Sequence, residues 1–153
     1  MLKGQGFLPS GAATGSTAVM VNGDTIFTVT GGPIEILQLQ SVCIAANDGT
    51  ASTLQYSTDP TVGTAKTISG ASASLASVAA GTTVTLNQTA LTTAPDVVTA
   101  ANGGVPLGAD VANRIVVQAG IITVVIGVGS TTGTWKHFIA YRPLAPGVTV
   151  VGT

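Results

Sequence analysis

The feature that most constrains the fold is a long run of β-forming residues near the C-terminal end of the sequence. Residues 115–128, IVVQAGIITVVIGV, are rich in Ile and Val, whose stiff side chains favour strands over helices. The run hardly alternates between apolar and polar residues, which is typical of a strand covered on both faces. A membrane-spanning helix is the alternative, but the uninterrupted apolar part is far shorter than the roughly 18 to 20 residues that a span requires. The run therefore predicts a β fold with a buried sheet.

A second strand is predicted at residues 135–142, after a hairpin loop at 130–133. Pro143 ends it, because proline has no N–H group to donate to a neighbouring strand. Both faces of this strand mix apolar and polar side chains, which indicates that a second surface lies over it, and another subunit is one source of such a surface. Alternation places Trp135, His137, Ile139 and Tyr141 on one face, and Lys136, Phe138, Ala140 and Arg142 on the other.

The first half of the chain predicts two consecutive hairpins between residues 17 and 58. The first, at 17–29, has Asn22 and Gly23 at its tip, a dipeptide typical of tight hairpins. In the second, the apolar phase slips within residues 34–46, which a β-bulge or a crossing between sheets would explain. Both hairpins would place strands that are adjacent in sequence side by side.

The remainder of the chain predicts short elements separated by loops. Small residues at 75–80 predict one or two helical turns, and residues 83–91 alternate as a strand. Residues 92–113 predict a long loop, and loops of that length are usually functional or mobile. The tail predicts an edge strand at Val148–Val151. Together these patterns predict an all-β fold: a single-domain β-sandwich, jelly roll or barrel of about eight to ten short strands.

Residues 1–16 hold Pro9 and several glycines but no apolar period, so they predict an extended N-terminal arm before a β domain at 17–153. The arm either anchors on a partner or is disordered when alone. The candidate contact residues are apolar side chains of the arm and the long loop, together with large side chains of the strand at 135–142. They are Leu2, Phe7, Leu8, Val105, Leu107, Trp135, Phe138, Tyr141 and Arg142.

Charge is unusually sparse. Asp, Glu, Lys and Arg make up 7% of the chain, against about 25% in ordinary soluble domains. A surface of Thr, Ser, Ala and Gly is poorly protected against association, so the chain is either a sticky monomer or, as we expect, largely covered by neighbours. The net charge of −1 gives no basic patch for nucleic acid or an anionic membrane. No export signal is visible after Lys3, so we expect synthesis in a cytoplasm.

The sequence offers little material for catalysis. His137 is the only His and Cys43 the only Cys, which excludes a site with two His ligands and a thiolate zinc cluster. A Ser-His-Asp arrangement stays open, because its members need not be adjacent in sequence, but His137 is expected to be a packed, hydrogen-bonded residue. Cys43 is expected to be a small buried hydrophobe. We therefore predict that the chain is not an enzyme and binds no cofactor.

The six carboxylates are scattered and never show the two-residue spacing of a calcium loop, so no metal site is predicted. Glu35 differs from the others because it interrupts an apolar strand. It is expected either to pair with Arg114 or Arg142 or to face solvent.

Three segments carry a family resemblance: DTIFTVTGGPIEILQLQSVCIAA at 24–46, LQYSTDPT at 54–61, and TWKHFIAYRPLAPGVTVVGT at 134–153. They resemble a loosely defined group of small structural proteins of tailed bacteriophages. Such proteins are often capsid decoration or cement proteins, which bind the outside of the head shell, commonly as trimers. The resemblance implies a virion protein on the capsid surface, with sister copies and the major capsid protein as partners. A tail or neck location is also open, and no catalytic residues carry over.

The alternative function is a tail or adhesin-type module that binds a carbohydrate receptor. Such a module needs exposed aromatic side chains beside polar loops. The candidates are Trp135, Tyr56 and Tyr141.

Overall fold

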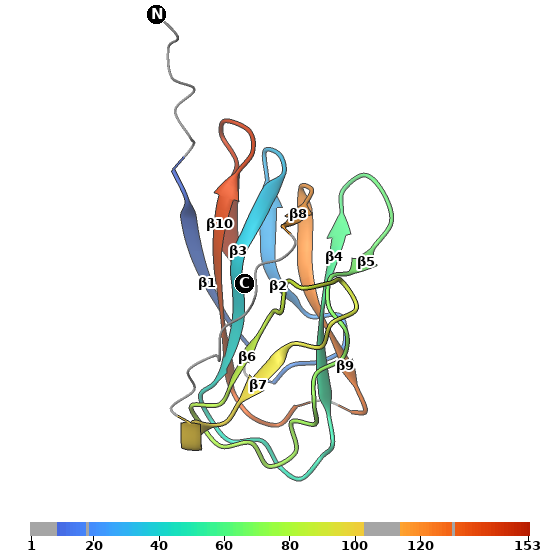
Figure 1. Ribbon diagram of the computed structural model, residues 1–153, viewed down its shortest axis with the longest axis vertical. Coiled ribbons are helices and arrows are strands. Elements are labelled where there is room, and N and C mark those ends of the chain that lie inside the picture. Colours follow the sequence, from blue (N-terminus) through green and yellow to red (C-terminus); the bar gives the residue numbers. More distant parts are fainter. Residues whose placement is uncertain (1–8, 18, 103–113, 130) are drawn as a thin grey trace, which may run out of the picture.

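The computed structural model describes residues 9–17, 19–102, 114–129 and 131–153. It contains eleven β-strands in two antiparallel sheets that pack face to face as a β-sandwich (Figure 1). The described residues include no α-helix, only a short 3₁₀ helix, η1, at Ala100–Asn102. The all-β prediction is confirmed, and of the architectures left open by the sequence the chain adopts the sandwich.

Each sheet combines strands from distant parts of the sequence. Sheet A has the order β1-β10-β3-β6-β7, with β8 also paired to β3, and sheet B has the order β11-β2-β9-β4-β5. Sheet A consists of β1 (Gly11–Thr17), β3 (Ile34–Cys43), β6 (Thr83–Thr85), β7 (Asp96–Val98), β8 (Ile115–Val117) and β10 (Trp135–Pro143). Sheet B consists of β2 (Thr25–Thr30), β4 (Thr53–Pro60), β5 (Lys66–Thr67), β9 (Gly120–Gly127) and β11 (Thr149–Gly152).

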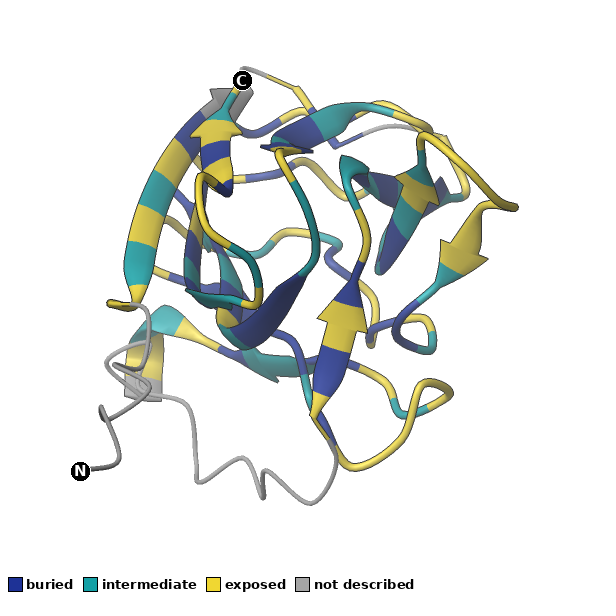
Figure 2. Ribbon diagram, turned by 90° about the horizontal axis from the view of Figure 1, so that it is seen from above, coloured by how far each residue is buried: buried dark blue, intermediate teal, exposed yellow. Residues whose placement is uncertain are grey.

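The core lies between the two sheets and is filled by the inward side chains of both. Buried and exposed residues alternate along the strands, as period-two strands with one dry face require (Figure 2). Trp135, Tyr56 and Phe27 are the largest fully buried side chains. Cys43 is also fully buried, as predicted.

The run at 115–128 divides into two strands in different sheets, β8 in sheet A and β9 in sheet B. In β9 the inward residues are buried and the outward ones are half-buried. The expectation of a single strand covered on both faces is therefore wrong, because a crossing at Gln118 and Ala119 lets both parts bury one face on the same core.

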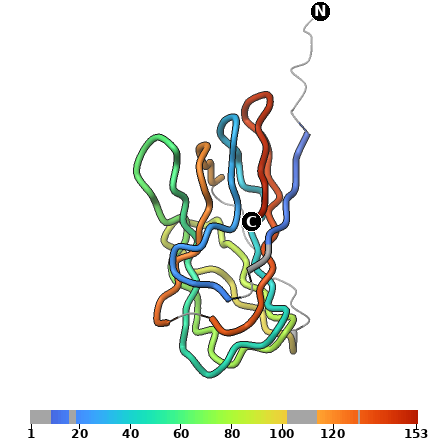
Figure 3. The backbone as a smooth tube through the Cα atoms, turned by 180° about the vertical axis from the view of Figure 1, so that it is seen from behind, coloured from blue at the N-terminus to red at the C-terminus, as the bar shows by residue number. Residues whose placement is uncertain are grey.

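The strands that were expected to form hairpins lie in different sheets, so the predicted hairpins are wrong, whereas β4 pairs with β5 and β6 with β7 within one sheet. The chain passes from β2 in sheet B to β3 in sheet A and back to β4 in sheet B, and again from β9 to β10 (Figure 3). A turn does form at the predicted tip, where the N–H of Asp24 donates to the carbonyl of Val21 at 3.1 Å. Turn residues fix a reversal of direction, but not the sheet that the next strand joins.

The first strand begins earlier than predicted. Residues 11–16 were expected in the arm, but they belong to β1, which pairs with β10 from Gly11 opposite Tyr141 to Thr17 opposite Trp135. The arm prediction is wrong for these residues, because backbone hydrogen bonding to a neighbouring strand needs no apolar period. Residues 1–8 lie outside the described residues.

Two other local predictions need correction. Residues 75–80 form a turn and not a helix, and the segment 92–113 contains β7 and η1 rather than loop alone. Residues 103–113 lie outside the described part of the chain. The predicted edge strand in the tail is confirmed as β11, which forms the edge of sheet B.

One long side of the sandwich is closed. There β1 and β11, the edge strands of the two sheets, lie side by side, and Gly15 and Gly152 permit this approach. A Cβ atom on Gly15 would lie 2.8 Å from the carbonyl oxygen of Ile26, and one on Gly152 would overlap the carbonyl oxygen of Thr14. The N–H of Thr153 also donates to the carbonyl of Ile26 at 3.2 Å. We call this contact the closed seam.

The opposite long side is open. There β8 of sheet A pairs only with β3 among the described strands, and β5 of sheet B pairs only with β4. A hollow of about 350 Å³ lies between these two strands. We call this hollow the open seam.

Candidate interaction face

The outward side of sheet A carries the candidate site. β10 lies between β1 and β3, so the strand registers align residues of all three strands in rows across the sheet. Two adjacent rows form what we call the outer face: Thr14, Phe138 and Gln40 in one, and Ala12, Ala140 and Gln38 in the other.

Phe138 is the dominant side chain of the outer face, and it is 38% exposed. All six outer-face residues line a hollow of about 300 Å³ beside its ring. A second hollow of about 270 Å³ lies on the side of Thr14, Lys136 and Thr153. The hollows exist because Phe138 has small neighbours on β1 and β10, so its ring stands above them.

The polar groups of the outer face are amides and a hydroxyl, without a formal charge. Nε2 of Gln38 donates to Oε1 of Gln40 at 3.0 Å. Each amide has two N–H donors and an oxygen with two lone pairs, so this pair keeps the capacity to bond a partner. An exposed aromatic residue among uncharged polar groups is the arrangement found at the centres of protein–protein interfaces.

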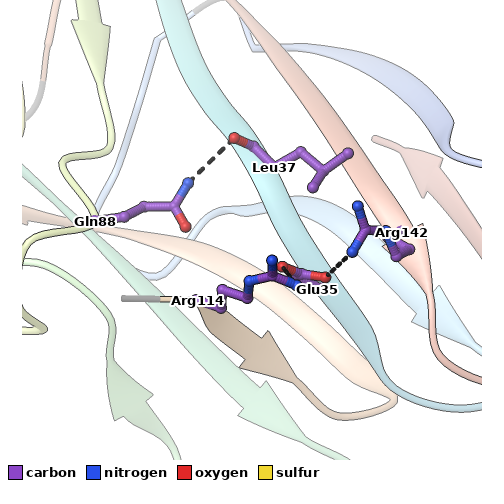
Figure 4. A network of polar contacts seen from close by, with 5 residues as sticks. All are labelled: Glu35, Leu37, Gln88, Arg114 and Arg142. Carbon is purple, nitrogen blue, oxygen red and sulfur yellow. Dashed lines mark hydrogen bonds and ion pairs between the residues drawn. The ribbon is translucent and has the colours of Figure 1, made fainter. Parts of the chain in front are cut away.

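Glu35 lies at one end of this side of sheet A, in contact with arginine side chains (Figure 4). Its Oε2 lies 3.0 Å from Nη1 of Arg142 on the neighbouring strand, and its Oε1 lies 3.3 Å from Nη1 of Arg114. The side chain of Glu35 is 7% exposed, against 34% for Arg142 and 69% for Arg114. The predicted pairing is confirmed with both arginines, and two cations on one carboxylate leave a net positive charge here.

Leu37 is the extra residue of a β-bulge in β3, since the register between β3 and β10 skips it. Of the two explanations that the apolar phase left open, a bulge or a crossing between sheets, the structure shows the bulge. The carbonyl of Leu37 accepts a hydrogen bond from Nε2 of Gln88 at 3.2 Å (Figure 4). Gln88 therefore contacts β3 between the stretch paired with β8 and the stretch paired with β6.

His137 belongs to a buried chain of hydrogen bonds between the sheets. Oγ of Ser41 lies 2.8 Å from Nδ1 of His137 and 2.8 Å from the hydroxyl oxygen of Tyr56. The hydroxyl of Tyr56 donates to the carbonyl of Val84 at 2.9 Å. Because a carbonyl only accepts, Tyr56 must accept from Ser41, and Ser41 must accept from a protonated Nδ1. The protons of this chain therefore all point away from His137.

Because Nδ1 of His137 donates a proton to the hydrogen bond with Ser41, it cannot accept the hydroxyl proton of Ser41. The two residues are therefore not suited to act as a nucleophile and its general base. Burial lowers the pKa of His137 to about 4, against a smaller opposing effect of Asp24, so the imidazole is neutral at pH 7. Burial also raises the pKa of Tyr56. The hydroxyl of Ser41 donates its hydrogen bond to Tyr56. Ser41 and Tyr56 are each 0% exposed. The prediction that His137 is a packed, hydrogen-bonded residue is confirmed.

The candidate contact residues fall into three groups. Trp135 and Tyr141 are 0% and 8% exposed, so their predicted place on a contact surface is wrong. Trp135 can be buried because its Nε1–H donates to Oδ1 of Asn47 at 3.3 Å. Phe138 and Arg142 lie on the outward side of sheet A. Leu2, Phe7, Leu8, Val105 and Leu107 lie outside the described residues.

The same burial removes the aromatic side chains on which carbohydrate binding would depend. Trp135 and Tyr56 are fully buried, and Tyr141 is buried as well. Stacking against a sugar requires an exposed ring, so none of these three can supply it in this fold.

The sequence reasoning missed most of the outer face. Gln38 and Gln40 alternate with the buried Leu39, and this pattern could have placed both amides on the outward side of a strand. Ala12 and Thr14 carried no such signal, because they lie in a glycine-rich segment without an apolar period.

Within the described ranges, no group of three or more His, Cys, Asp or Glu side chains is placed to hold a metal ion. In that part of the chain there is also no helix long and apolar enough to span a membrane. No family model matches the chain, and neither does a curated protein or a solved structure. The resemblance to phage structural proteins therefore stays a prediction.

Proposed function

We propose that this chain is a non-enzymatic structural protein of a virion. In this proposal it is a capsid decoration or cement protein that binds the outside of the phage head shell as a homotrimer. The observation that carries the proposal is the outer face, where a 38% exposed Phe138 lies among uncharged side chains, with Lys136 at the border. The resemblance of the segments at 24–46, 54–61 and 134–153 to small phage structural proteins supplies the virion setting.

The outer face would serve contacts between sister copies. In a closed ring of three copies, each interface joins two different surfaces, so Phe138 of one copy would pack against another part of the next. Because the chain has only 7% charged residues, few charges need to be desolvated when such faces are buried. Many copies bound at once to a shell would resist its expansion through avidity, even when each contact is weak.

The native mass of the purified protein by light scattering, across concentration and salt, tests this proposal. We expect a salt-resistant trimer for the wild type and a monomer for Phe138→Asp, because a carboxylate at the centre of the interface would be buried without a partner. Val62→Asp is the matched control: Val62 is 88% exposed in the β4–β5 connection, away from the outer face, so this variant should remain trimeric. A wild-type monomer that also fails to bind shells lacking the protein would contradict the proposal.

A further inference from the structure

The open seam combines an apolar floor with basic side chains. Ile68 and Ile115 are buried at 3% and 5% exposure, whereas Leu91 and Val116 are 43% and 48% exposed beside them. Thr58 also lines the hollow. A hollow of about 350 Å³ with this lining can accept one or two small apolar side chains.

Two of the five basic residues of the chain border this one hollow. Lys66 lies on the exposed strand β5. Arg114 directly precedes β8, and although one of its nitrogens contacts Glu35, its side chain is 69% exposed. A guanidinium has five N–H donors, so Arg114 can bind a second carboxylate while it keeps the first.

The backbone beside the hollow is suited to an added strand. Within the described chain, β8 pairs with β3 along Ile34–Ile36 and has no strand on its other side. An extended peptide can pair with such an edge through its main chain, while alternate side chains enter pockets next to it. A free small acid could use the apolar floor and the cations but not this edge.

We propose that the open seam binds an extended segment of another protein, in which a carboxylate side chain lies close to apolar side chains. The segment adds to the edge of β8, places an apolar side chain against Ile68 and Ile115, and places its carboxylate near Lys66 and Arg114. The identification of that protein as a subunit of the head shell rests on the proposed function. The chemistry of the segment rests on the charges and the edge of the open seam alone.

The test uses the ¹⁵N-labelled full chain titrated by NMR with two synthetic peptides, acetyl-TVEVT-amide and its glutamine counterpart acetyl-TVQVT-amide. The glutamate peptide should shift the amide signals of β8 and of residues 66–68, and it should bind about two- to fivefold more tightly than the glutamine peptide. Lys66→Gln should remove most of this difference. Lys136→Gln, which removes a lysine from the outward side of β10, should preserve it.

A charge exchange sharpens the test. Lys66→Glu should bind the peptide acetyl-TVKVT-amide better than the wild type does, which a general loss of structure could not produce. Equal binding of the glutamate and glutamine peptides by the wild type, or shifts confined to other strands, would overturn the inference.

The same variants separate this inference from the proposed function. If the wild type binds shells lacking the protein and Lys66→Glu binds them equally well, the open seam is not the docking site and the inference fails, while the proposed function stands. If the peptides bind at β8 but no form of the protein binds shells, the seam has the proposed chemistry and the capsid function fails.

Discussion

The two long sides of this sandwich differ in how their edge strands are covered. Any two-sheet sandwich has edge strands whose unpaired backbone groups invite other chains. At the closed seam, Gly15 and Gly152 bring β1 and β11 so close that the two edges cover one another. At the open seam, β5 and β8 stay apart, and Lys66 and Arg114 border the space between them. One fold thus covers one pair of edge strands by close backbone contact and leaves β5 and β8 without a second neighbour among the described strands.

Adding one β-carbon at Gly152 should disrupt the packing of the closed seam. In Gly152→Ala the new Cβ would overlap the carbonyl oxygen of Thr14, and backbone cannot move aside as a flexible side chain can. We expect the free energy of unfolding to fall by about 3 kcal/mol, the upper end for overpacking, in urea denaturation. Gly49→Ala is the control, because its Cβ would meet nothing nearer than Oγ of Ser77 at 3.9 Å, and it should change stability by less than about 1 kcal/mol. Equal effects of the two substitutions would show that the seam is not tightly closed.

Acid should lower the stability of the fold, because the buried His137 lies in β10, the strand that pairs with β1 of the closed seam. The imidazole titrates at about pH 6.5 in the unfolded chain but has a pKa of about 4 in the fold. Between these values the unfolded state binds more protons, so stability should fall as pH drops from 7 to 4, by about 3 kcal/mol. Chemical denaturation at several pH values measures this, and His137→Gln should lack the histidine component. An unchanged acid dependence in that variant would assign the effect to other groups.

The charged end of sheet A, which borders the open seam through Arg114, should contribute a smaller amount. Glu35→Gln removes the carboxylate shared by Arg142 and Arg114. Because both arginines keep contact with water, the loss should be about 1 to 2 kcal/mol, below the 3 to 5 kcal/mol typical of a fully buried pair. Asp59→Asn, which removes an exposed carboxylate of β4, is the charge-matched control and should leave stability nearly unchanged. A double-mutant cycle with Arg142→Met would give the coupling energy directly.

A substitution in the open seam should have little effect on the free energy of unfolding. Val116 is 48% exposed there, so Val116→Thr should alter the free energy of unfolding by less than about 0.5 kcal/mol. Thermal unfolding measures this difference. A loss above about 1 kcal/mol would mean that Val116 is packed in the folded chain and that the seam is less open than described.

Period-two alternation predicted where strands run and, in part, which side chains face inward. The tail strand followed from a short apolar pattern. The slip in apolar phase at 34–46 predicted a bulge or a sheet crossing, and the charge of Glu35 in an apolar strand predicted an arginine partner or exposure to solvent. The structure shows the bulge, at Leu37, and the arginine pairing. Alternation also put Trp135 and Tyr141 on the opposite side of β10 from Phe138. It could not tell which side faced the core, because each carries aromatic residues, and burial of Trp135 depends on the distant Asn47.

The arrangement of the sheets and both seams could not be predicted in this way. A turn such as Asn22-Gly23 reverses the chain whether the next strand pairs with the last or crosses to the other sheet. The seams depend on neighbours far apart in sequence, such as Gly15 beside Thr153 and Lys66 across from Arg114. Only the packing of the two complete sheets brings these residues together.

The crossing connections have a consequence for how the chain reaches its native state. β1 pairs with β10, so Gly11 must find Tyr141 before the first strand is fixed, and neither sheet can form from neighbours in sequence alone. Topologies dominated by such distant pairings fold on a timescale of roughly milliseconds to seconds. Throughout that interval a chain with 7% charged residues exposes apolar strands with little repulsion between copies. We therefore expect slow folding to expose newly made protein to aggregation, whatever the stability of the final fold.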